Sequence, residues 1–411
     1  MCRSVYIFIV ILSVFSCLSC KNGKSGIAVS PIQSNRSLEE INIDNAKKVD
    51  KIFFSTYFNS PSVVVLETNE QCIIQNIRAI DHFNNKYYIL DDKSNALYVF
   101  SDEGSFIRHI GSIGSGHGEY IEISDFSIDR DKKELYLWDE ALDVALKYDV
   151  DTGEYLSSIH TERNGERSFC MQYYNGHLYV NKTSADENGD HYLLKEIDME
   201  SGLQRSAYLN AADYNRGWNY PIRLSCSFFY SKNCSVPKYI EMFSDTIVAI
   251  TEEGIVPQYV VKSRDFITCE DIAQLKKTSP DYIDIDMRLL TKLRRIFCIS
   301  RYADLKDGVT FEFMHGEDKF YLVYDKNNGT SIVSSEFVND YISKEMFVPT
   351  NICYSDEQGV LTYILPNHMS YFVEHFVREG RLNQNIENFD KLSHLNDDSN
   401  PVLFYHKYRK Q

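Results

Sequence analysis

YYILDDKSNALYVFSDEGSFIRHI, residues 87–110, and LYLWDEALDVALKYDVDTGEYLSSI, residues 135–159, are two copies of one pattern. Each begins with an apolar, aromatic strand that ends at an acidic turn. A second strand then ends in an aromatic residue, and a turn containing Asp and Gly leads to a third strand. Short alternating runs rich in Tyr and Phe favour strands over helices. The two copies therefore predict a repeated β unit.

Fainter copies follow the two clear ones. In all, the pattern starts six times, at Tyr87, Leu135, Leu178, Tyr239, Phe320 and Val360. A period of roughly 40 to 60 residues with about four strands per unit is what a β-propeller blade requires. The chain also contains 29 Tyr and 24 Phe, which suit such strands. We therefore predict an all-β chain folded as a six-bladed β-propeller.

One segment departs from the strand pattern. Thr268 and Asp271 have the spacing of a helix capping box. Apolar residues on helical stripes follow: Ile272, Ala273, Leu275, Met287, Leu290, Leu293 and Phe297. This predicts a short helical insertion over about residues 268–299. We expect this apolar face to pack against the propeller itself; the alternative is that it binds a partner.

The N-terminus has the layout of an export signal, with Arg3 followed by an apolar stretch from Val5 to Phe15 and then by small and apolar residues. Cys20 follows Ser19 and is the predicted lipidated residue, although Cys17 or an ordinary signal peptidase site would also fit. The prediction is a lipoprotein signal peptide over 1–19, a flexible tether over 20–47 and the propeller over 48–411.

Charge and cysteine content narrow the function classes. The formal charge of −16 makes nucleic acid an unsuitable partner. Without Cys2, Cys17 and Cys20 seven cysteines remain, at irregular spacing and without a Cys-x-x-Cys pair, so neither a zinc site nor a thioredoxin-like motif is supported. Most are expected to be buried. Cys226 and Cys234 could face each other across a hairpin as a disulfide.

Residues 106–120, FIRHIGSIGSGHGEY, followed by DFSID at 125–129, resemble the signature of a family of six-bladed β-propeller lipoproteins. These are bacterial surface or periplasmic proteins related to NHL-repeat propellers. Their run typically has Gly-x-Gly-Pro-Gly-Glu-Tyr, whereas this chain has His117 in place of Pro. The family has no single established activity, so the resemblance implies a fold and a location and transfers no catalytic residue.

The resemblance covers nearly the whole mature chain, with further matches at Val63–Thr68, Asp245–Ile247 and Asn400–Leu403. The terminal matches imply how the ring closes. Val63–Glu67 and Val402–His406 are expected to share one blade, which removes exposed sheet edges.

His117, Glu119 and Tyr120 are the first candidate ligand-binding cluster. A His and a carboxylate two residues apart can do acid/base work, and the neighbouring glycines would allow a ligand to approach closely. The alternative is structural: the glycines suit a tight crossover between blades, with Glu119 accepting backbone hydrogen bonds and Tyr120 packed between sheets.

Arg216 and Trp218 are the second candidate pair. They lie in an aromatic-rich segment between blades, and Arg and Trp anchor ligands when exposed. For Trp218 a place in the core is the alternative, and Trp138, which is flanked by strand residues, is expected to be core.

Other constellations are weaker. Asp149–Glu154 is similar to half of a calcium loop but lacks the later Glu, so a hairpin turn is expected. Asp284 and Asp286 have no matching partner for glycosidase chemistry. No nucleophile elbow, zinc-protease helix, P-loop or dinucleotide fingerprint occurs, so no catalytic residue, metal ligand or cofactor is predicted.

The sequence thus favours a lipid-anchored cell-envelope propeller that binds a ligand or partner at one mouth of its central channel. Its expected partners are the membrane, through the lipid, and an envelope protein or a glycan. The alternative is a metal-dependent propeller hydrolase or lyase, which requires inward-facing His, Asp or Glu from three or more blades.

Overall fold

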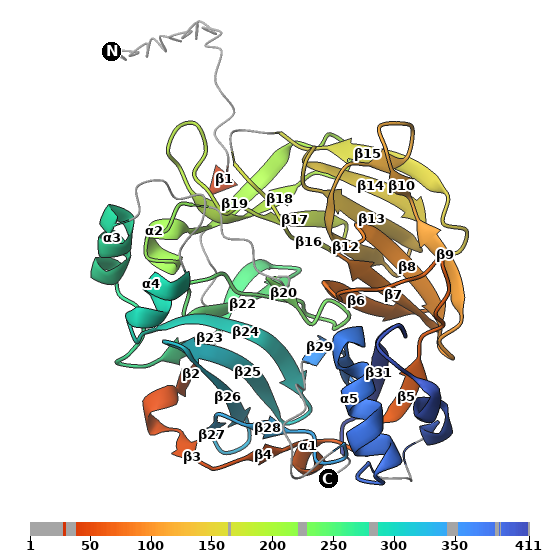
Figure 1. Ribbon diagram of the computed structural model, residues 1–411. Coiled ribbons are helices and arrows are strands. Elements are labelled where there is room, and N and C mark those ends of the chain that lie inside the picture. Colours follow the sequence, from red (N-terminus) through yellow and green to blue (C-terminus); the bar gives the residue numbers. More distant parts are fainter. Residues whose placement is uncertain are drawn as a thin grey trace, which may run out of the picture.

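Six small sheets form a ring in the computed structural model, as Figure 1 shows from one face. The structure describes residues 28–29, 38–162, 166–220, 228–278, 287–342, 352–382, 386 and 388–409. Each sheet is an antiparallel blade with its first strand nearest the axis. The prediction of an all-β, six-bladed β-propeller is therefore confirmed.

Blades 1 and 2 contain the two clear copies of the sequence pattern, and blade 3 contains a fainter one. Blade 1 consists of β6 (Ala79–Phe83), β7 (Lys86–Asp91), β8 (Ala96–Ser101) and β9 (Phe106–Ile110). Blade 2 consists of β12 (Ile123–Asp129), β13 (Glu134–Asp139), β14 (Val144–Asp149) and β15 (Tyr155–His160). Blade 3 consists of β16 (Met171–Tyr174), β17 (His177–Asn181), β18 (Tyr192–Ile197) and β19 (Gln204–Asn210), and β1 (Ala28–Val29) pairs with β19.

The other three blades are less regular. Blade 4 consists of β20 (Phe229–Tyr230), β21 (Lys238–Tyr239), β22 (Thr246–Thr251) and β23 (Gly254–Lys262). Blade 5 consists of β24 (Ile296–Leu305), β25 (Gly308–His315), β26 (Asp318–Asp325) and β27 (Thr330–Ser334). Blade 6 consists of β29 (Ile352–Ser355), β30 (Gly359–Ile364), β31 (Val402–Lys407) and β5 (Ser62–Val65).

The predicted repeat is out of phase with the blades. Five of the six predicted starts fall on the second strand of a blade, and Phe320 falls on β26, the third strand of blade 5. The unpredicted first strands line the axis and carry buried polar residues, as in β12, where Ser124, Asp125 and Ser127 are all buried. These polar residues remove the apolar alternation that marks a strand in the sequence.

The ring closes by pairing strands from the two ends of the chain. β5 is antiparallel to β31, with Val64 opposite Leu403 and Val63 opposite Phe404. The expected shared blade is therefore confirmed, and it joins the ends of the ring by a ladder of hydrogen bonds.

The N-terminal segment continues around the outer edges of blades 4 and 5. β2 (Glu39–Asn42) pairs with β23, β3 (Lys47–Lys48) pairs with β27, and β4 (Ile52–Phe53) pairs with β28 (Phe337–Val338). Ile41 of β2 is fully buried. Residues 39–47, which we assigned to the tether from their polarity, thus cover sheet edges that would otherwise expose unpaired backbone groups.

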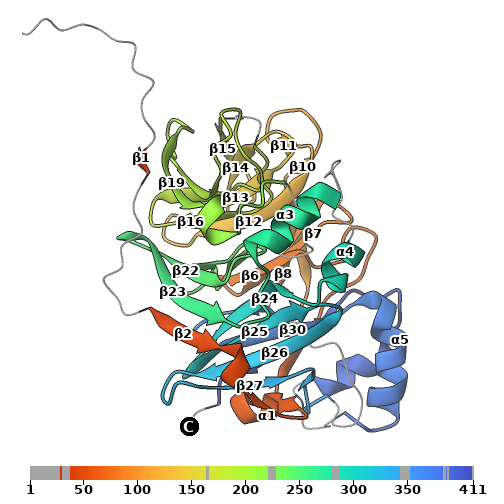
Figure 2. The same cartoon turned by 90° about the vertical axis from the view of Figure 1, so that its left-hand side faces the viewer.

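Because neighbouring strands in a blade are antiparallel, the connections between strands alternate between two faces of the ring. On one, here called the crossover face, the last strand of each blade connects to the first strand of the next. The helices α2 (Ala211–Tyr214), α3 (Cys269–Thr278) and α4 (Met287–Lys292) belong to such connections, and α5 (Met369–Phe372) belongs to the connection between β30 and β31. Figure 2 shows α3, α4 and α5 on the same side of the ring. The opposite face, here called the hairpin face, consists mostly of short turns.

The helices are short, and no helix among the described residues is long and apolar enough to cross a membrane. α1 (Phe54–Tyr57) follows β4, and 3-10 or π turns occur at Ile43–Asn45, Pro366–His368, Val373–Arg378 and Phe389–His394. The start of α3 is the reciprocal cap that its spacing predicts. The Thr268 backbone N–H donates to Asp271 Oδ2 (3.0 Å), and the Asp271 backbone N–H donates to Thr268 Oγ1 (3.1 Å). Phe297 lies on β24, so the helical stripe ends before it.

A buried side-chain acceptor at the end of the second strand orders the crossovers of the first blades. Asp91 accepts the backbone N–H of Gln75 (2.8 Å), and Asp139 accepts that of Ile121 (2.7 Å). In blade 3 the equivalent residue is Asn181, which accepts the N–H of Cys170 (2.8 Å). The acidic turns of the sequence repeat thus hold the incoming chain as well as turning the outgoing one.

Candidate functional site

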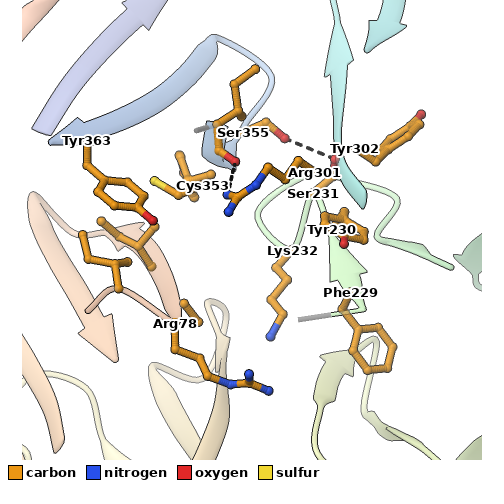
Figure 3. Close-up of a pocket in the computed structure, with 15 residues that line it drawn as sticks. Arg78, Phe229, Tyr230, Ser231, Lys232, Arg301, Tyr302, Cys353, Ser355 and Tyr363 are labelled. Atoms are coloured by element: carbon orange, nitrogen blue, oxygen red, sulfur yellow. Dashed lines mark hydrogen bonds between the residues drawn. The ribbon is translucent and has the colours of Figure 1, made fainter. Parts of the chain in front are cut away.

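The first strands of blades 1, 4, 5 and 6 leave a narrow pocket of about 80 Å³ on the axis of the ring. Three cationic residues belong to its lining, Arg78 just before β6, Lys232 just after β20 and Arg301 on β24. Figure 3 shows the Arg78 and Lys232 side chains extending toward the bottom of the view and the Arg301 guanidinium near Cys353 and Ser355. None of the fifteen described lining residues carries a carboxylate. This is unusual in a chain with 59 acidic and 43 basic residues.

The floor of the pocket is a segment of blade 4 that crosses the axis, Ser231–Cys234, here called the plug. Its Lys232 Nζ donates to Asp125 Oδ1 on blade 2 (2.6 Å) and to the carbonyl oxygens of Phe126 and Met171 (both 3.1 Å). Because Met171 belongs to blade 3, one ammonium group ties blade 4 to two other blades.

The rest of the plug contacts the remaining blades. Asn233 Nδ2 donates to the carbonyl oxygen of His82 on blade 1 (3.3 Å) and to the Tyr354 hydroxyl on blade 6. Ser231 Oγ donates to Asp304 Oδ2 on blade 5 (3.4 Å). The plug thus bonds to all five other blades and separates the axial pocket from the hairpin face.

The two arginines are held from opposite sides. Arg78 is buried and donates its Nε to the Ser124 carbonyl oxygen (2.8 Å), while its Nη2 lies 3.9 Å from Cys170 Sγ. Arg301 donates Nη1 to the Ile352 carbonyl oxygen (3.4 Å), and its Nε lies 3.5 Å from Glu312 Oε2. These contacts fix both guanidinium groups before any ligand arrives.

The remaining polar groups of the lining stay uncharged near neutral pH. Burial raises the pKa of Tyr302 well above its usual value, and the nearby Asp304 carboxylate raises it further. Desolvation raises the pKa of the Cys353 thiol to about 12. Ser231 and Ser355 contribute hydroxyls 3.3 Å apart. The charge of the lining therefore comes from its three cations.

The glycine-rich segment carrying His117, Glu119 and Tyr120 connects blade 1 to blade 2, away from the axis. The strands β10 (Ser112–Ile113) and β11 (Glu119–Tyr120) pair within it. Glu119 Oε2 accepts the backbone N–H of Gly116 (2.7 Å), and Tyr120 is buried with its hydroxyl donating to the Asn95 carbonyl oxygen (3.0 Å). These are the contacts that the structural interpretation expected.

His117 is exposed, whereas Glu119 is half-buried. Its ring packs edge-on against Tyr155 with centroids 4.6 Å apart. The structure thus keeps His117 and Glu119 in one crossover, and the contacts it describes for them are within blades 1 and 2 and the connection between them.

Arg216 and Trp218 lie together in the connection between blades 3 and 4, a different crossover from the glycine-rich one. Trp218 is only 3% exposed and donates its Nε1 to the Tyr220 carbonyl oxygen (2.8 Å). Arg216 Nη2 donates to Asp245 Oδ2 (2.6 Å), and its guanidinium lies 4.6 Å from the Phe266 ring centre. Both side chains thus make contacts within the protein, in and around this crossover.

The other sequence candidates divide between described and undescribed residues. Trp138 is fully buried, as expected, and Asp149–Gly153 forms a hairpin turn in which Asp149 Oδ1 accepts the Thr152 N–H (2.7 Å). Of the six described cysteines, Cys72, Cys170 and Cys298 are buried. Cys20, Cys226, Asp284 and Asp286 lie outside the described residues.

Among the described residues, no three His, Cys, Asp or Glu side chains come together as a group that could hold a metal ion. The metal-dependent alternative requires such a group near the axis, where the described lining is cationic. The sequence arguments missed Arg78, Lys232 and Arg301. A cation inside a short apolar run, as in Ile77-Arg78-Ala79-Ile80, was the available signal.

This architecture defines a six-bladed β-propeller whose axial channel is interrupted by a plug. A family model matches residues 38–407, and the chain belongs to that family, which is described as a domain of unknown function (DUF4934).

Solved structures share the fold at low sequence identity. A protein from Bacteroides fragilis NCTC 9343 described as a "putative exported protein" is 18% identical, with a TM-score of 0.71 over 91% of this chain and 100% of that one. A member of the DUF4221 family from Bacteroides vulgatus ATCC 8482 is 10% identical, with a TM-score of 0.48 over 86% of this chain and 98% of that one. No curated protein matches the sequence.

Proposed function

We propose that this protein is a binding module of the bacterial cell envelope, anchored by a lipid on Cys20 and related to the NHL-like propeller lipoproteins. The anchor rests on the signal layout of residues 1–20. The description of the Bacteroides fragilis protein as exported agrees with it. The protein then faces the periplasm or the cell surface, and residues following Cys20 lead to the propeller.

The observation that carries the binding role is the plug. A channel crossed by hydrogen bonds to five blades cannot serve as a conduit, whereas a small concave pocket with convergent polar groups is suited to holding a ligand. The pocket lies on the crossover-face side of the plug, where the longer connections lie. Such connections on a rigid scaffold also offer a surface for an envelope protein or a glycan.

Acylation is tested by metabolic labelling of the full-length chain with an alkynyl fatty acid in a bacterial host. We expect the wild-type chain and Cys17→Ala to be labelled and to fractionate with membranes. Cys20→Ala should lose both the label and the membrane association. Labelling that depends on Cys17, or no labelling at all, would contradict the anchor.

Binding is tested by thermal unfolding of the purified protein in the presence of a panel of small compounds: neutral sugars, amino acids, amides, carboxylates and inorganic phosphate. A compound that binds the folded state raises the melting temperature in a saturable manner. We expect at least one chemical class to do so. If no class does, the pocket is not a binding site for a free small molecule.

A further inference from the structure

A second and larger pocket lies on the outer rim of the ring, between blades 4 and 5, and is here called the rim pocket. Its volume is about 540 Å³, whereas that of the axial pocket is about 80 Å³. The N-terminal segment forms one wall, through Ile43, Asp44, Lys48 and Val49, where it runs from β23 to β27. Figure 1 shows β2 and β3 alongside those strands. Residues 263–265, directly after β23, and the strands β24 to β27 form the other walls.

The floor of the rim pocket is apolar and partly aromatic. Ile296, Phe313 and Val333 line it and are buried. The half-buried Phe320 stacks its ring on that of Phe313, with the ring centroids 5.5 Å apart and the planes inclined by 21°. His315 lies beside Phe320, with centroids 6.4 Å apart. Because the protein does not fully cover Phe320, its ring offers an apolar surface to a ligand in the pocket.

The charges of the lining balance. Apart from His315, the described lining contains two carboxylates, of Asp44 and Asp265, and two cations, of Lys48 and Arg264. Asp44 is already paired: it accepts the Arg264 backbone N–H (3.0 Å), and the Arg264 Nε lies 3.3 Å from the same oxygen. A lining without net charge gives no general preference for an anion or a cation.

Asp265 and Lys48 are the charged groups that remain available to a ligand. The Asp265 carboxylate lies 4.0 Å from His315 Nε2, too far for a hydrogen bond. The exposed Lys48 side chain has neither a hydrogen bond nor an ion pair among the described residues. One wall of the pocket therefore offers an acceptor and the N-terminal wall offers a donor.

Size and charge narrow the class of ligand. Pockets for small ligands have volumes of about 300–1,000 Å³ and combine an apolar lining with a few polar groups. A protein partner would need a wider surface, about 800 Å² on each side. A pyranose ring is neutral, packs its C–H groups on the electron-rich face of an aromatic ring, and carries hydroxyls that both donate and accept. These properties match the floor, the charge balance and the two available polar groups of the rim pocket.

We infer that the rim pocket binds a neutral pyranose unit of an envelope glycan, with the sugar ring on Phe320 and its hydroxyls bonded to Asp265 and Lys48. This inference rests on the proposed binding role and extends it to a second pocket. Because the N-terminal segment forms one wall, the bound sugar also joins that segment to blades 4 and 5.

The test is isothermal titration calorimetry on the intact wild-type protein. The probes are the neutral disaccharides maltose, cellobiose, lactose and N,N′-diacetylchitobiose. Sorbitol carries similar hydroxyls without a ring, and N-acetyltryptophanamide represents an aromatic side chain of a protein partner. We expect at least one disaccharide to bind and sorbitol not to bind. Binding of sorbitol as tightly as the best disaccharide would overturn the inference, because the ring would then not be what the pocket recognises.

Variants then locate the site. Phe320→Ala is expected to weaken sugar binding about tenfold or more, since it removes the apolar surface. Phe320→Trp keeps an aromatic ring and should bind within about threefold of the wild type. Asp265→Ala tests the polar group without touching the core and should weaken binding about fivefold or more. Thermal unfolding verifies that each variant is folded.

Phe106→Ala is the matched control for Phe320→Ala. Phe106 is also half-buried, and its ring packs on that of Phe100 in blade 1, with centroids 5.7 Å apart. Its removal should leave the affinity for the sugar unchanged. An equal loss of affinity in Phe106→Ala would mean that weakened packing, and not the loss of a sugar contact, explains the effect of Phe320→Ala, which contradicts the inference.

Hydrogen exchange locates the sugar independently. The Val49 N–H donates to the Val333 carbonyl oxygen (3.0 Å), which fastens the N-terminal wall to blade 5. A sugar held against this wall should slow exchange in residues 43–49 and leave blade 2 unchanged. Slowing confined to other parts of the ring would place the sugar elsewhere and refute the inference.

The remaining outcomes separate the inference from the binding role. A sugar that binds Phe320→Ala, Asp265→Ala and the wild-type protein equally well is held elsewhere, so the inference fails and the binding role stands. If N-acetyltryptophanamide or another compound of the thermal panel binds but no disaccharide does, the sugar chemistry is refuted and the binding role again stands. If nothing in either experiment binds, the binding role and the inference fail together.

Discussion

The Nζ atom of Lys232 lies 2.6 Å from Oδ1 of Asp125, so that an ion pair joins blade 4 to blade 2 across the axis of the ring. Asp125 is fully buried, and it also accepts the backbone N–H of Met171 on blade 3 (3.0 Å). One carboxylate therefore organises three blades. The first strand of blade 4, β20, has only two residues, and the ion pair between Asp125 and the plug directly after it helps to hold β20 in the ring.

Removing Lys232 should be costly. Lys232→Met removes the ammonium group that lies 2.6 Å from the buried Asp125 carboxylate, and breaking a buried pair in this way typically costs about 3–5 kcal/mol. We expect this loss in the free energy of unfolding measured by urea titration. The double variant Asp125→Asn with Lys232→Met should recover part of the stability, because the residue that faced the lysine is then neutral.

The surface pair Lys133–Asp151 (2.9 Å) is the matched control, since both side chains are about half exposed. Lys133→Met should leave the unfolding transition where it is. If Lys232→Met is equally harmless, the plug is not held by its ion pair, and the backbone contacts of Asn233 would have to carry it.

Glu241 should make the protein less stable as pH rises toward 7. Burial raises the pKa of this carboxyl to about 7, although the Tyr239 hydroxyl donates to its Oε2 (2.6 Å) and opposes the shift. The folded state therefore binds a proton that the unfolded state releases above about pH 4.5. Stability is fully present below that value and falls through pH 7.

Glu241→Gln removes this titration. It should match the wild-type protein near pH 5 and exceed it at pH 8 by roughly 2–3 kcal/mol, measured by urea titration at both pH values. The exposed Glu200→Gln is the control and should leave the pH profile unchanged. A Glu241→Gln variant that is less stable at pH 8 would mean that the ionised carboxylate is needed in the fold.

His406 should act in the opposite direction. Nε2 of this buried imidazole accepts a hydrogen bond from Asn339 Nδ2 (3.0 Å), and desolvation lowers the pKa of His406 to about 3. The unfolded state, with an ordinary histidine pKa, binds the proton first as pH falls below about 6.5. Its contribution is fully present above that pH and is lost as the pH falls toward 3, by up to about 1.4 kcal/mol per pH unit.

The clean window is pH 5 to 6.5, where most ordinary carboxylates remain ionised. As the pH rises through this window, the wild-type protein should gain stability relative to His406→Gln, whereas the difference between the wild type and the exposed His117→Gln should stay constant. Parallel profiles for His406→Gln and the wild-type protein would show that His406 is not the group that titrates.

How far the sequence predicts this molecule depends on which strand is considered. Second and third strands such as β7, β8, β13 and β14 alternate apolar residues between acidic and glycine turns, and the predicted starts Tyr87 and Leu135 each lie one residue after the first residue of β7 and β13. First strands face a polar axis instead of a hydrophobic core. β12, ISDFSID, buries Ser and Asp because other blades supply their partners, so its burial cannot be deduced from its own composition.

The pocket was missed for the same reason. Arg78, Lys232 and Arg301 come from three blades, and their place in one pocket lining depends on a ring that no local pattern encodes. By contrast, the contacts of Glu119 with the glycines are local in the chain, and the structural interpretation of that segment included them. Sequence patterns thus predicted contacts within a crossover, whereas contacts across the axis required the assembled blades.

Gly118 should tolerate no side chain. Its φ is +75°, and a Cβ there would lie 2.7 Å from Tyr155 Cβ. Gly176 has a similar φ of +83° but open space around it. Both alanine variants pay for the left-handed backbone. Only Gly118→Ala should add a packing cost of about 1–3 kcal/mol, seen as a lower urea midpoint. Equal losses would mean that Tyr155 moves aside at little cost.

Asn400 should be critical for closing the ring. It precedes β31, and its buried side chain reaches the connection that leads from β5 into blade 1: Oδ1 accepts the Ile74 N–H (2.7 Å), and Nδ2 donates to the Glu67 carbonyl oxygen (2.6 Å). Asn400→Ala leaves these groups without partners, and each buried unsatisfied group costs about 1–3 kcal/mol. We expect a loss of roughly 2–5 kcal/mol in urea titration.

The control is Asn59→Ala, which removes an exposed side chain near the same closure, one that donates to the Tyr408 carbonyl oxygen (3.3 Å). Its effect should stay within about 0.5 kcal/mol. A ring that opens at its seam should also expose β5 and β31 together, so Asn400→Ala should speed hydrogen exchange in both strands before it does so in blade 3. If exchange instead rises equally in all blades, the contact between β5 and β31 is no weaker than the contacts within the other blades. The Asn400 side chain is then not what keeps the ring closed.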